Sequence, residues 1–277
     1  MIVVTGATGN VGRSLAARLL AAGAPVRALA RDPRRVLLPE RAEVVRFDPA
    51  EPAALFAGAT KLFLYAQAGA ADLLEAAREH GVRHVVLLSS GIIQEGADET
   101  HPIHVMHADV ERRIRESGLA WTFLRPNAFA TNALQWAPQI RAGESAVRGV
   151  FADALSAPIH EDDIAAVAER ALLDDGHEGA AHRLTGPEAT TNTDQVAAIG
   201  RAVGRELTFV EVPPREAGRE LFPHVPPPML DRLLGNFEES IGVPPEITGT
   251  VEKITGTPAR TFARWAEDHS EDFRPQP

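Results

Sequence analysis

The chain contains no cysteine among its 277 residues. Disulfide bonds, thiolate catalysis and zinc or iron–sulfur centres held by cysteine are therefore excluded. No uninterrupted apolar run approaches the roughly 20 residues that a membrane-spanning helix needs. Tyrosine is almost absent as well, since Tyr65 is the only one.

Basic residues are outnumbered by acidic ones. Lysine and arginine total 28 against 38 aspartates and glutamates, which gives a formal charge of −10. Broad binding to nucleic acid needs a basic surface, so no DNA or RNA partner is expected. The chain opens on a strand-forming run rather than on a basic segment with an apolar signal core. We expect a cytoplasmic protein that acts on a small molecule without a membrane, and the composition leaves a homodimer open.

Short β-type runs alternate with helical segments through the first half of the chain. We expect strands at 2–5, 26–30, 43–47, 61–65, 84–88 and 121–124, and helices at 11–22, 53–57, 72–80 and 103–117. Almost wholly apolar strands that alternate with helices indicate right-handed βαβ units and a parallel sheet covered on both faces. The expected fold class is α/β, a doubly wound parallel Rossmann sheet with a smaller, mostly helical C-terminal substrate region.

The second half of the chain has a looser pattern. Helices are expected at 161–173, 193–203 and 229–240 and strands at 183–185 and 208–212, and the prolines between 213 and 245 separate short helices. We expect residues 1–153 to form the cofactor-binding core, and residues 154–277 to add late core elements and the substrate cleft.

The strongest local signal is a glycine loop that leads from the first strand into the first helix. Gly6 allows a sharp turn, Gly9 allows close approach to a pyrophosphate, and Gly12 allows the helix to pack. Backbone N–H groups at the helix start would hold the anion. This strand–turn–helix context predicts a dinucleotide site. Its expected contacts are Gly6, Thr8, Gly9, Asn10, Val11 and Gly12.

The residue that follows the second strand indicates which dinucleotide binds. An acid at this position favours a free ribose 2′-hydroxyl, whereas a base accommodates a 2′-phosphate. Here the position is Arg31, and a planar guanidinium suits a phosphate. Asp32 beside it argues in the other direction, and a merely solvated basic turn is the alternative. We predict NADP(H) as the cofactor.

Several short strings resemble the short-chain dehydrogenases/reductases, and more narrowly their atypical, extended branch with the NmrA-like proteins and the nucleotide-sugar epimerases. The matching strings occur in the family's order along the whole chain. They are Thr5-Gly6-Ala7-Thr8-Gly9, Ala30-Arg31-Asp32-Pro33, Phe47-Asp48, Leu88-Ser89-Ser90, Glu111, Ser117-Gly118-Leu119, Leu124-Arg125-Pro126-Asn127, Asp162-Asp163, Thr185-Gly186-Pro187 and Thr255-Gly256-Thr257-Pro258.

The resemblance implies further site residues. Asp48 matches the acidic residue near the adenine, while Ala66 and Ser89 follow the fourth and fifth strands among the expected cofactor contacts. Asn127 and Phe129 match positions that border the substrate cleft, although Phe129 reads equally well as core. Residues 92–102 fit either a mobile loop over that cleft or an ordinary exposed connection.

The sequence departs from the family at the catalytic pair. Standard members use Tyr-x-x-x-Lys on the helix after the fifth strand, with the tyrosine as proton donor. Alignment on Glu111 puts His107 at the lysine position and Ile103 at the tyrosine position. His107 is therefore the first candidate for proton delivery, with His104 as its rival and Ser90 as the remaining hydroxyl.

These histidines have two other possible roles, in a helix-surface pair or at a metal. His107 and Glu111 stand four residues apart and could form a simple pair on the helix surface. His101, His104 and His107 are spread too widely around a helix to converge on a metal, so no metal site is expected.

The expected function is an NADPH-dependent reductase that delivers hydride to an activated carbonyl, such as an aromatic ketone or a quinone-like molecule of secondary metabolism. The alternative is a non-catalytic, NmrA-like sensor that binds NADP(H) and regulates a protein partner. A nucleotide-sugar epimerase is disfavoured because that chemistry depends on the missing tyrosine.

Overall fold

The computed structural model describes residues 1–66, 72–214, 221–222, 225 and 227–275. The chain forms two compact units that interleave along the sequence. The first comprises residues 1–127, 161–184 and 250–257, and the second comprises residues 128–160, 185–249 and 258–277. Two late segments thus belong to the unit that holds the glycine loop. The division expected at residue 153 separates a cofactor-binding region from a substrate region. That assignment of functions stays a prediction.

The first unit is built on a seven-stranded sheet in the order β3-β2-β1-β4-β5-β6-β9. Every neighbouring pair is parallel. The strands are β1 (Ile2–Val4), β2 (Val26–Ala30), β3 (Glu43–Arg46), β4 (Lys61–Tyr65), β5 (His84–Leu88), β6 (Ala120–Pro126) and β9 (Ala180–Leu184). The doubly wound parallel sheet is confirmed, and its chain order reverses between β1 and β4.

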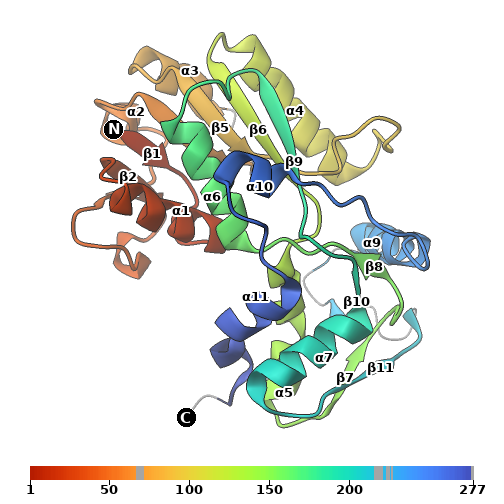
Figure 1. Ribbon diagram of the computed structural model, residues 1–277. Helices are drawn as coiled ribbons and strands as arrows, with labels where there is room; N and C mark the ends of the chain where they lie inside the picture. The colour runs from red at the N-terminus through yellow and green to blue at the C-terminus, as the bar shows by residue number, and fades with distance from the viewer. Residues whose placement is uncertain (67–71, 215–220, 223–224, 226, 276–277) are drawn as a thin grey trace. The chain divides into compact units, whose positions relative to one another are not determined.

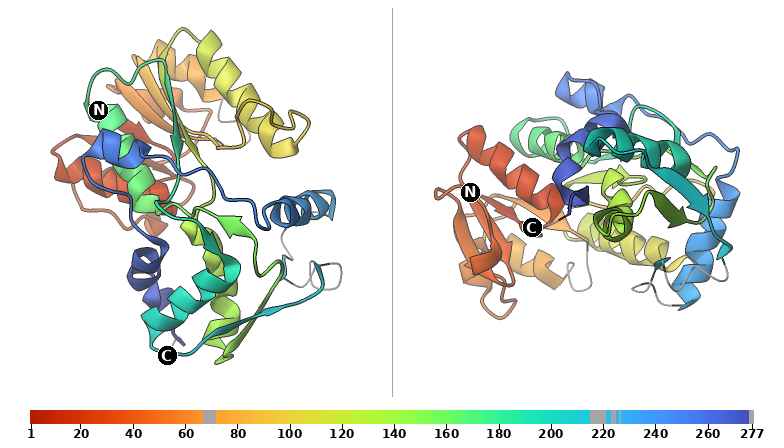
Figure 2. Two further views of the ribbon diagram at one scale, coloured as in Figure 1. Left: turned by 45° about the vertical axis from the view of Figure 1, so that its right-hand side comes forward. Right: turned by 90° about the horizontal axis from the view of Figure 1, so that it is seen from below.

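Alternate residues of each strand pack on opposite faces of this sheet. On one face Leu62, Leu64, Val85 and Leu87 share a buried core with residues of α2, α3 and α4. The other face carries α1, α6 and α10, which lie side by side (Figures 1 and 2). The helices are α1 (Asn10–Ala21), α2 (Pro52–Phe56), α3 (Leu73–Glu79), α4 (Pro102–Glu116), α6 (Glu161–Leu173) and α10 (Thr250–Thr255), with a 3-10 turn η1 (Pro33–Arg35).

Two strands differ from the sequence-based expectation. β6 begins one residue earlier and ends two residues later than expected, and β9 spans Ala180–Leu184 instead of 183–185. The sequence Ala-Ala-His-Arg-Leu has little strand propensity of its own. Pairing with β6, in which Thr122 lies opposite Ala180 and Pro126 opposite Leu184, makes it a strand.

The second unit combines short strand pairs with helices. β7 (Ala146–Gly149) and β11 (Thr208–Glu211) are parallel, and β8 (Leu155–Ser156) and β10 (Thr190–Thr191) are antiparallel. Its core contains Trp136, Ile140, Ile199 and Trp265. The helical elements are η3 (Ala130–Trp136), α5 (Ala137–Arg141), α7 (Asn192–Val203), α9 (Pro227–Glu239), α11 (Phe262–Asp268) and η4 (Ser270–Phe273).

The expected helix at 229–240 is confirmed as α9, whereas the short helices expected just before it fall largely outside the described residues. In the described part of the chain, no helix has both the length and the apolar character that crossing a membrane requires.

Candidate functional site

The glycine loop closes a tight turn between β1 and α1. The Gly9 N–H donates to the Gly6 carbonyl over 2.9 Å, and Gly6 adopts a φ of 64°, which favours glycine. The first helical bond of α1 runs from the Arg13 N–H to the Gly9 carbonyl over 2.9 Å. Gly9 is the N-cap and supplies no side-chain cap. The N–H groups of the first turn are therefore available to an anion.

The space around the loop fits a bound pyrophosphate. A Cβ added at Gly12 would lie 2.3 Å from the Gly6 carbonyl oxygen, so Gly12 is required by the loop itself. A Cβ at Gly9 would meet only that same oxygen, at 3.3 Å. Leaving aside the two chain neighbours of Gly9, this oxygen is the one described protein atom within 4 Å of that position. Thr8 and Asn10 beside it are exposed, while Val11 is buried and anchors the helix start.

Arg31 follows β2 at the carboxyl edge of the sheet and is exposed. Asp32 is committed to Arg34: its carboxylate accepts from the Arg34 backbone N–H over 3.2 Å and from Nε over 2.9 Å. Among the residues that the structure describes, no acidic group pairs with Arg31. Asp32, the acid that argued against a phosphate site at Arg31, therefore does not neutralise the Arg31 guanidinium.

The other expected cofactor residues also follow strands of the first unit. Asp48 comes two residues after β3 and its carboxylate accepts from the Ala50 N–H over 3.0 Å, in the turn before α2. Ala66 follows β4 and is buried. The carboxyl ends of parallel strands lie at one edge of a sheet, where open α/β proteins bind ligands. Their contact with a cofactor stays a prediction.

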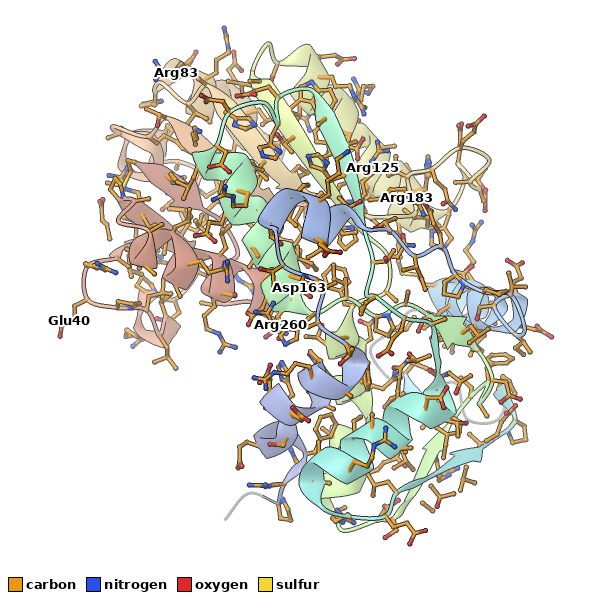
Figure 3. All side chains as sticks on the ribbon, in the orientation of Figure 1. Glu40, Arg83, Arg125, Asp163, Arg183 and Arg260 are labelled. Atoms are coloured by element: carbon orange, nitrogen blue, oxygen red, sulfur yellow. The ribbon has the colours of Figure 1, made fainter. Side chains whose placement is uncertain are left out.

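A buried polar cluster joins the ends of β5 and β6 to α4. Glu111 is 1% exposed and accepts hydrogen bonds from the Ser89 hydroxyl (2.7 Å) and from Nε and Nη2 of Arg125 (2.9 and 2.6 Å). Arg115, one turn further along α4, donates to the same carboxylate over 2.9 Å. Figure 3 labels Arg125 on β6 and its register partner Arg183 on β9. Because the Ser89 hydroxyl donates to Glu111, in this structure it ties the end of β5 to α4.

The buried position of Glu111 corrects one interpretation. Glu111 does not form a pair with His107 on the helix surface, because it faces the sheet and meets two arginines. The sequence held a signal for this: Val110 and Ile114 are the apolar, sheet-facing neighbours of Glu111 on α4. A charge on such a stripe needs partners, and Arg125 on the adjacent strand could not be identified before strand order was known.

His107 lies one helical turn before Glu111. α4 starts after the carboxyl end of β5 and returns to the amino end of β6, so its N-terminal turns lie toward the candidate site. The Nδ1 atoms of His107 and His104 are buried, and neither has a hydrogen-bond partner among the described residues. Burial lowers the pKa of His107, and the Glu111 carboxylate opposes that shift.

His101 precedes α4, as expected, and caps it. Its Nδ1 accepts from the Ile103 N–H over 3.2 Å. No group of three His, Asp or Glu side chains suited to a metal occurs in the described ranges.

Ser90, Gly91 and Asn127 meet where β5 and β6 end. The Gly91 N–H donates to the Pro126 carbonyl over 2.7 Å, and a Cβ at Gly91 would lie 1.7 Å from Oδ1 of Asn127. A serine at position 91 would therefore collide with Asn127, which leaves Ser90 as the hydroxyl in this register. Ser90 Oγ accepts from the Ile92 N–H over 3.3 Å.

Phe129 and the 92–102 segment are the two remaining site elements that the sequence suggested. Phe129 lies in the second unit, half-buried, and forms a parallel bridge with Ile159. In the 92–102 segment, Gln94 accepts from Nη1 of Arg183 over 2.6 Å, which ties that connection to β9. The roles of Asn127 and Phe129 toward a substrate stay predictions.

The comparisons with known proteins agree with this geometry. Residues 6–175 match a family model described as NAD(P)H-binding. The chain is 40% identical to (4-alkanoyl-5-oxo-2,5-dihydrofuran-3-yl)methyl phosphate reductase of Streptomyces griseus, with 100% of both chains covered. It is 34% identical to the NAD(P)H azoreductase of Xenophilus azovorans, with 99% of each covered.

A solved structure has the same architecture. The NADPH-dependent quinone oxidoreductase of Escherichia coli superposes with a TM-score of 0.77 at 25% identity, over 97% of this chain and 99% of that one. The family match covers the glycine loop from Gly6 onward, the ends of β2 to β6, and α4. The chain belongs to the NAD(P)H-binding family of Rossmann proteins.

Proposed function

We propose that this protein is an NADPH-dependent reductase that delivers hydride to an activated carbonyl or quinone-like small molecule. The observation that carries the proposal is the glycine loop at the reversal point of the sheet, with an uncapped helix start and open space over Gly9. Its relatives named above are all reductases. We further place it in the atypical, extended branch of the short-chain dehydrogenases/reductases.

The loop and Arg31 would hold the cofactor. The N–H groups of the α1 start bind the pyrophosphate, and Arg31, which no described acid neutralises, binds the 2′-phosphate. When bound, NADPH supplies the hydride. This arrangement favours NADPH over NADH, because only NADPH carries a 2′-phosphate for the Arg31 guanidinium to bind.

The acceptor is a molecule that needs little help from an acid. The relatives are named for a dihydrofuranone that carries two carbonyl groups, for azo compounds and for a quinone. Each is an electron-poor conjugated system in which negative charge that develops on hydride addition is delocalised. Ile103 stands where the family tyrosine is expected, and such acceptors suit a site without that phenol.

His107 is the proposed proton donor to the reduced substrate. Its place on the N-terminal half of α4, one turn before the anchored Glu111, supports this role. Because burial lowers the pKa of His107, the cationic form that could donate a proton needs a lower pH than an ordinary histidine would. Asn127, packed on Gly91, is the proposed substrate contact.

The direct test is the loss of NADPH absorbance with a panel of quinones, unsaturated furanones, azo compounds and aromatic ketones. Turnover well above the rate without protein, abolished in Gly9→Val, is the expected result. If NADPH binds and no panel member is reduced, the regulator alternative is favoured over the enzyme. If NADPH does not bind, both are wrong.

A further inference from the structure

The connection from β5 to α4, residues 89–101, is fastened to the sheet where it begins. The Gly91 N–H donates to the Pro126 carbonyl over 2.7 Å. Gly91 also packs on the Asn127 side chain, since a Cβ there would lie 1.7 Å from Oδ1 of Asn127. The connection therefore starts against the end of β6, beside the proposed substrate contact.

Turns then fold the connection along its length. The Ala97 N–H donates to the Gln94 carbonyl over 3.3 Å, and the His101 N–H donates to the Asp98 carbonyl over 3.1 Å. The Asp98 carboxylate also accepts from the Thr100 N–H over 2.9 Å. Because such turns fix the positions of neighbouring residues, a contact made near the middle of the connection bears on both of its ends.

Gln94 makes a contact of this kind. Its Oε1 accepts from Nη1 of Arg183 over 2.6 Å, although the two residues are 89 positions apart in the chain. Gln94 is exposed, so burial does not hold it in place. A hydrogen bond from a guanidinium is stronger than one between two neutral groups. In Figure 3, Arg183 lies beside the connection that leads into α4.

The strand β6 lies between the two partners of this contact. The sheet order places β5, β6 and β9 side by side, and Arg183 on β9 is opposite Arg125 on β6. Gln94 follows β5, so its bond to Arg183 spans the end of β6. β9 also supports that end directly, because the Asn127 N–H donates to the Leu184 carbonyl over 3.1 Å.

We propose that Arg183 is a positioning residue for the hydride acceptor, because through Gln94 it holds the β5–α4 connection across the end of β6. The connection then forms a wall of the acceptor site next to Asn127, and the acceptor binds less well when the contact is lost. This inference rests on the proposed function, because it requires an acceptor at the carboxyl ends of these strands. It gives a specific role to residues 92–102.

Hydrogen exchange of the ligand-free protein tests the contact itself. Gln94→Ala and Arg183→Gln should each speed amide exchange in residues 91–101 about two- to tenfold, because this segment then opens more often. Both changes remove the same contact, so the double variant should exchange no faster than either single variant. Arg112→Gln is the control and should leave exchange in 91–101 unchanged, because Arg112 is exposed and has its own acidic partners on α4.

Steady-state kinetics with a quinone that the unmodified protein reduces tests the consequence for the acceptor. In both single variants, the KM for the quinone should rise about three- to tenfold, while kcat and the calorimetric affinity for NADPH stay within about twofold. Gln94→Glu keeps an oxygen that can accept from Arg183, so it should retain slow exchange and a low KM. A general loss of stability would instead lower the thermal midpoint, kcat and NADPH affinity together.

Three results would overturn the inference. If exchange in residues 91–101 is the same in both single variants as in the unmodified protein, the contact does not hold the connection, and the proposed function stands. If exchange speeds up and the KM for the quinone does not change, the connection is held by Arg183 but is no part of the acceptor site. If the unmodified protein binds NADPH and reduces no acceptor, the proposed function fails and the inference fails with it.

Discussion

Glu111 and Arg125 form a buried two-point ion pair between α4 and the end of β6. Nε and Nη2 of Arg125 donate to the two carboxylate oxygens of Glu111 over 2.9 and 2.6 Å. The Ser89 hydroxyl, at the end of β5, donates another hydrogen bond to the Glu111 carboxylate. One carboxylate thereby fixes the helix that carries His107 to both strands whose ends border the candidate active site.

Glu111→Gln should be strongly destabilising. It leaves the Arg125 guanidinium, which is largely buried, without its countercharge, and breaking a buried ion pair on one side costs about 3–5 kcal/mol. The free energy of unfolding in urea measures this effect. Glu116→Gln is the matched control on the same helix, because Glu116 is exposed and its pair with Arg112 should contribute under about 1 kcal/mol. Equal losses in the two variants would mean that the cluster is not a structural anchor.

Arg31→Ala should weaken NADPH about ten- to a hundredfold and leave NADH nearly unchanged, because the variant loses a charged partner of the 2′-phosphate. Calorimetric titration with both cofactors measures the difference. Arg34→Ala is the control, since Arg34 is exposed and already paired with Asp32. Equal affinity of the unmodified protein for NADPH and NADH would show that Arg31 does not select the 2′-phosphate.

Gly9→Val should abolish dinucleotide binding in a folded protein, because the side chain occupies space that only the loop oxygen borders. Gly249→Val, at an exposed glycine with open space around it, is the control. Calorimetry and a thermal melt separate lost binding from lost folding. Normal binding by Gly9→Val would place the cofactor elsewhere.

His107→Ala should lower turnover by about ten- to ten-thousandfold if the imidazole is the general acid. Its pKa lies below the ordinary value of about 6.5 because of burial. The cationic donor therefore forms only as the pH falls through that lowered pKa, and kcat/KM should rise in that range and then level off. The rise should vanish in His107→Ala and persist in His104→Ala and Ser90→Ala. A loss confined to His104→Ala would assign the proton to the rival donor.

His84 should make the first unit sensitive to acid. Burial and the charges of Lys61 and His177 lower the pKa of His84, and the carboxylate of Glu178 partly offsets this shift. Its Nε2 is hydrogen-bonded to Thr122 Oγ1, which itself donates to the His177 carbonyl, so Nε2 carries the proton. The unfolded chain then binds a proton near pH 6.5 that the folded chain resists, and stability falls as the pH drops below that value.

The test for His84 is urea unfolding between pH 7 and pH 5. His84→Gln should flatten the pH dependence of the free energy of unfolding. A pH dependence that survives His84→Gln unchanged would assign the acid sensitivity to other groups.

Much of the first unit follows from local sequence. β2, β4, β5 and α6 have the bounds that the sequence predicted, because apolar runs mark the three strands and acidic residues mark the start of α6. β9 was displaced by three residues at its start, since its strand state comes from pairing with β6 and not from its own residues. The parallel pairing of β7 with β11, some 60 residues apart in sequence, leaves no local signal either.

The candidate site likewise combines features set by local sequence with features set by long-range contacts. The glycine loop is a local pattern, and the sequence could identify it. The partners of Glu111 come from the ends of β5 and β6, outside the helix that carries it. Such relationships depend on strand order, which residue type and spacing do not encode.

Whether the protein transfers hydride from NADPH can be followed with deuterium, from C4-labelled NADPH to an unsaturated furanone. Both C4 epimers are supplied in turn, and the product is examined by mass spectrometry for label on carbon. Hydride transfer from bound NADPH should give one deuterium in the product from one epimer, no label from the other, and no product with Gly9→Val. Bound NADPH with no label in any product across the acceptor panel would contradict the assignment of this protein as a reductase.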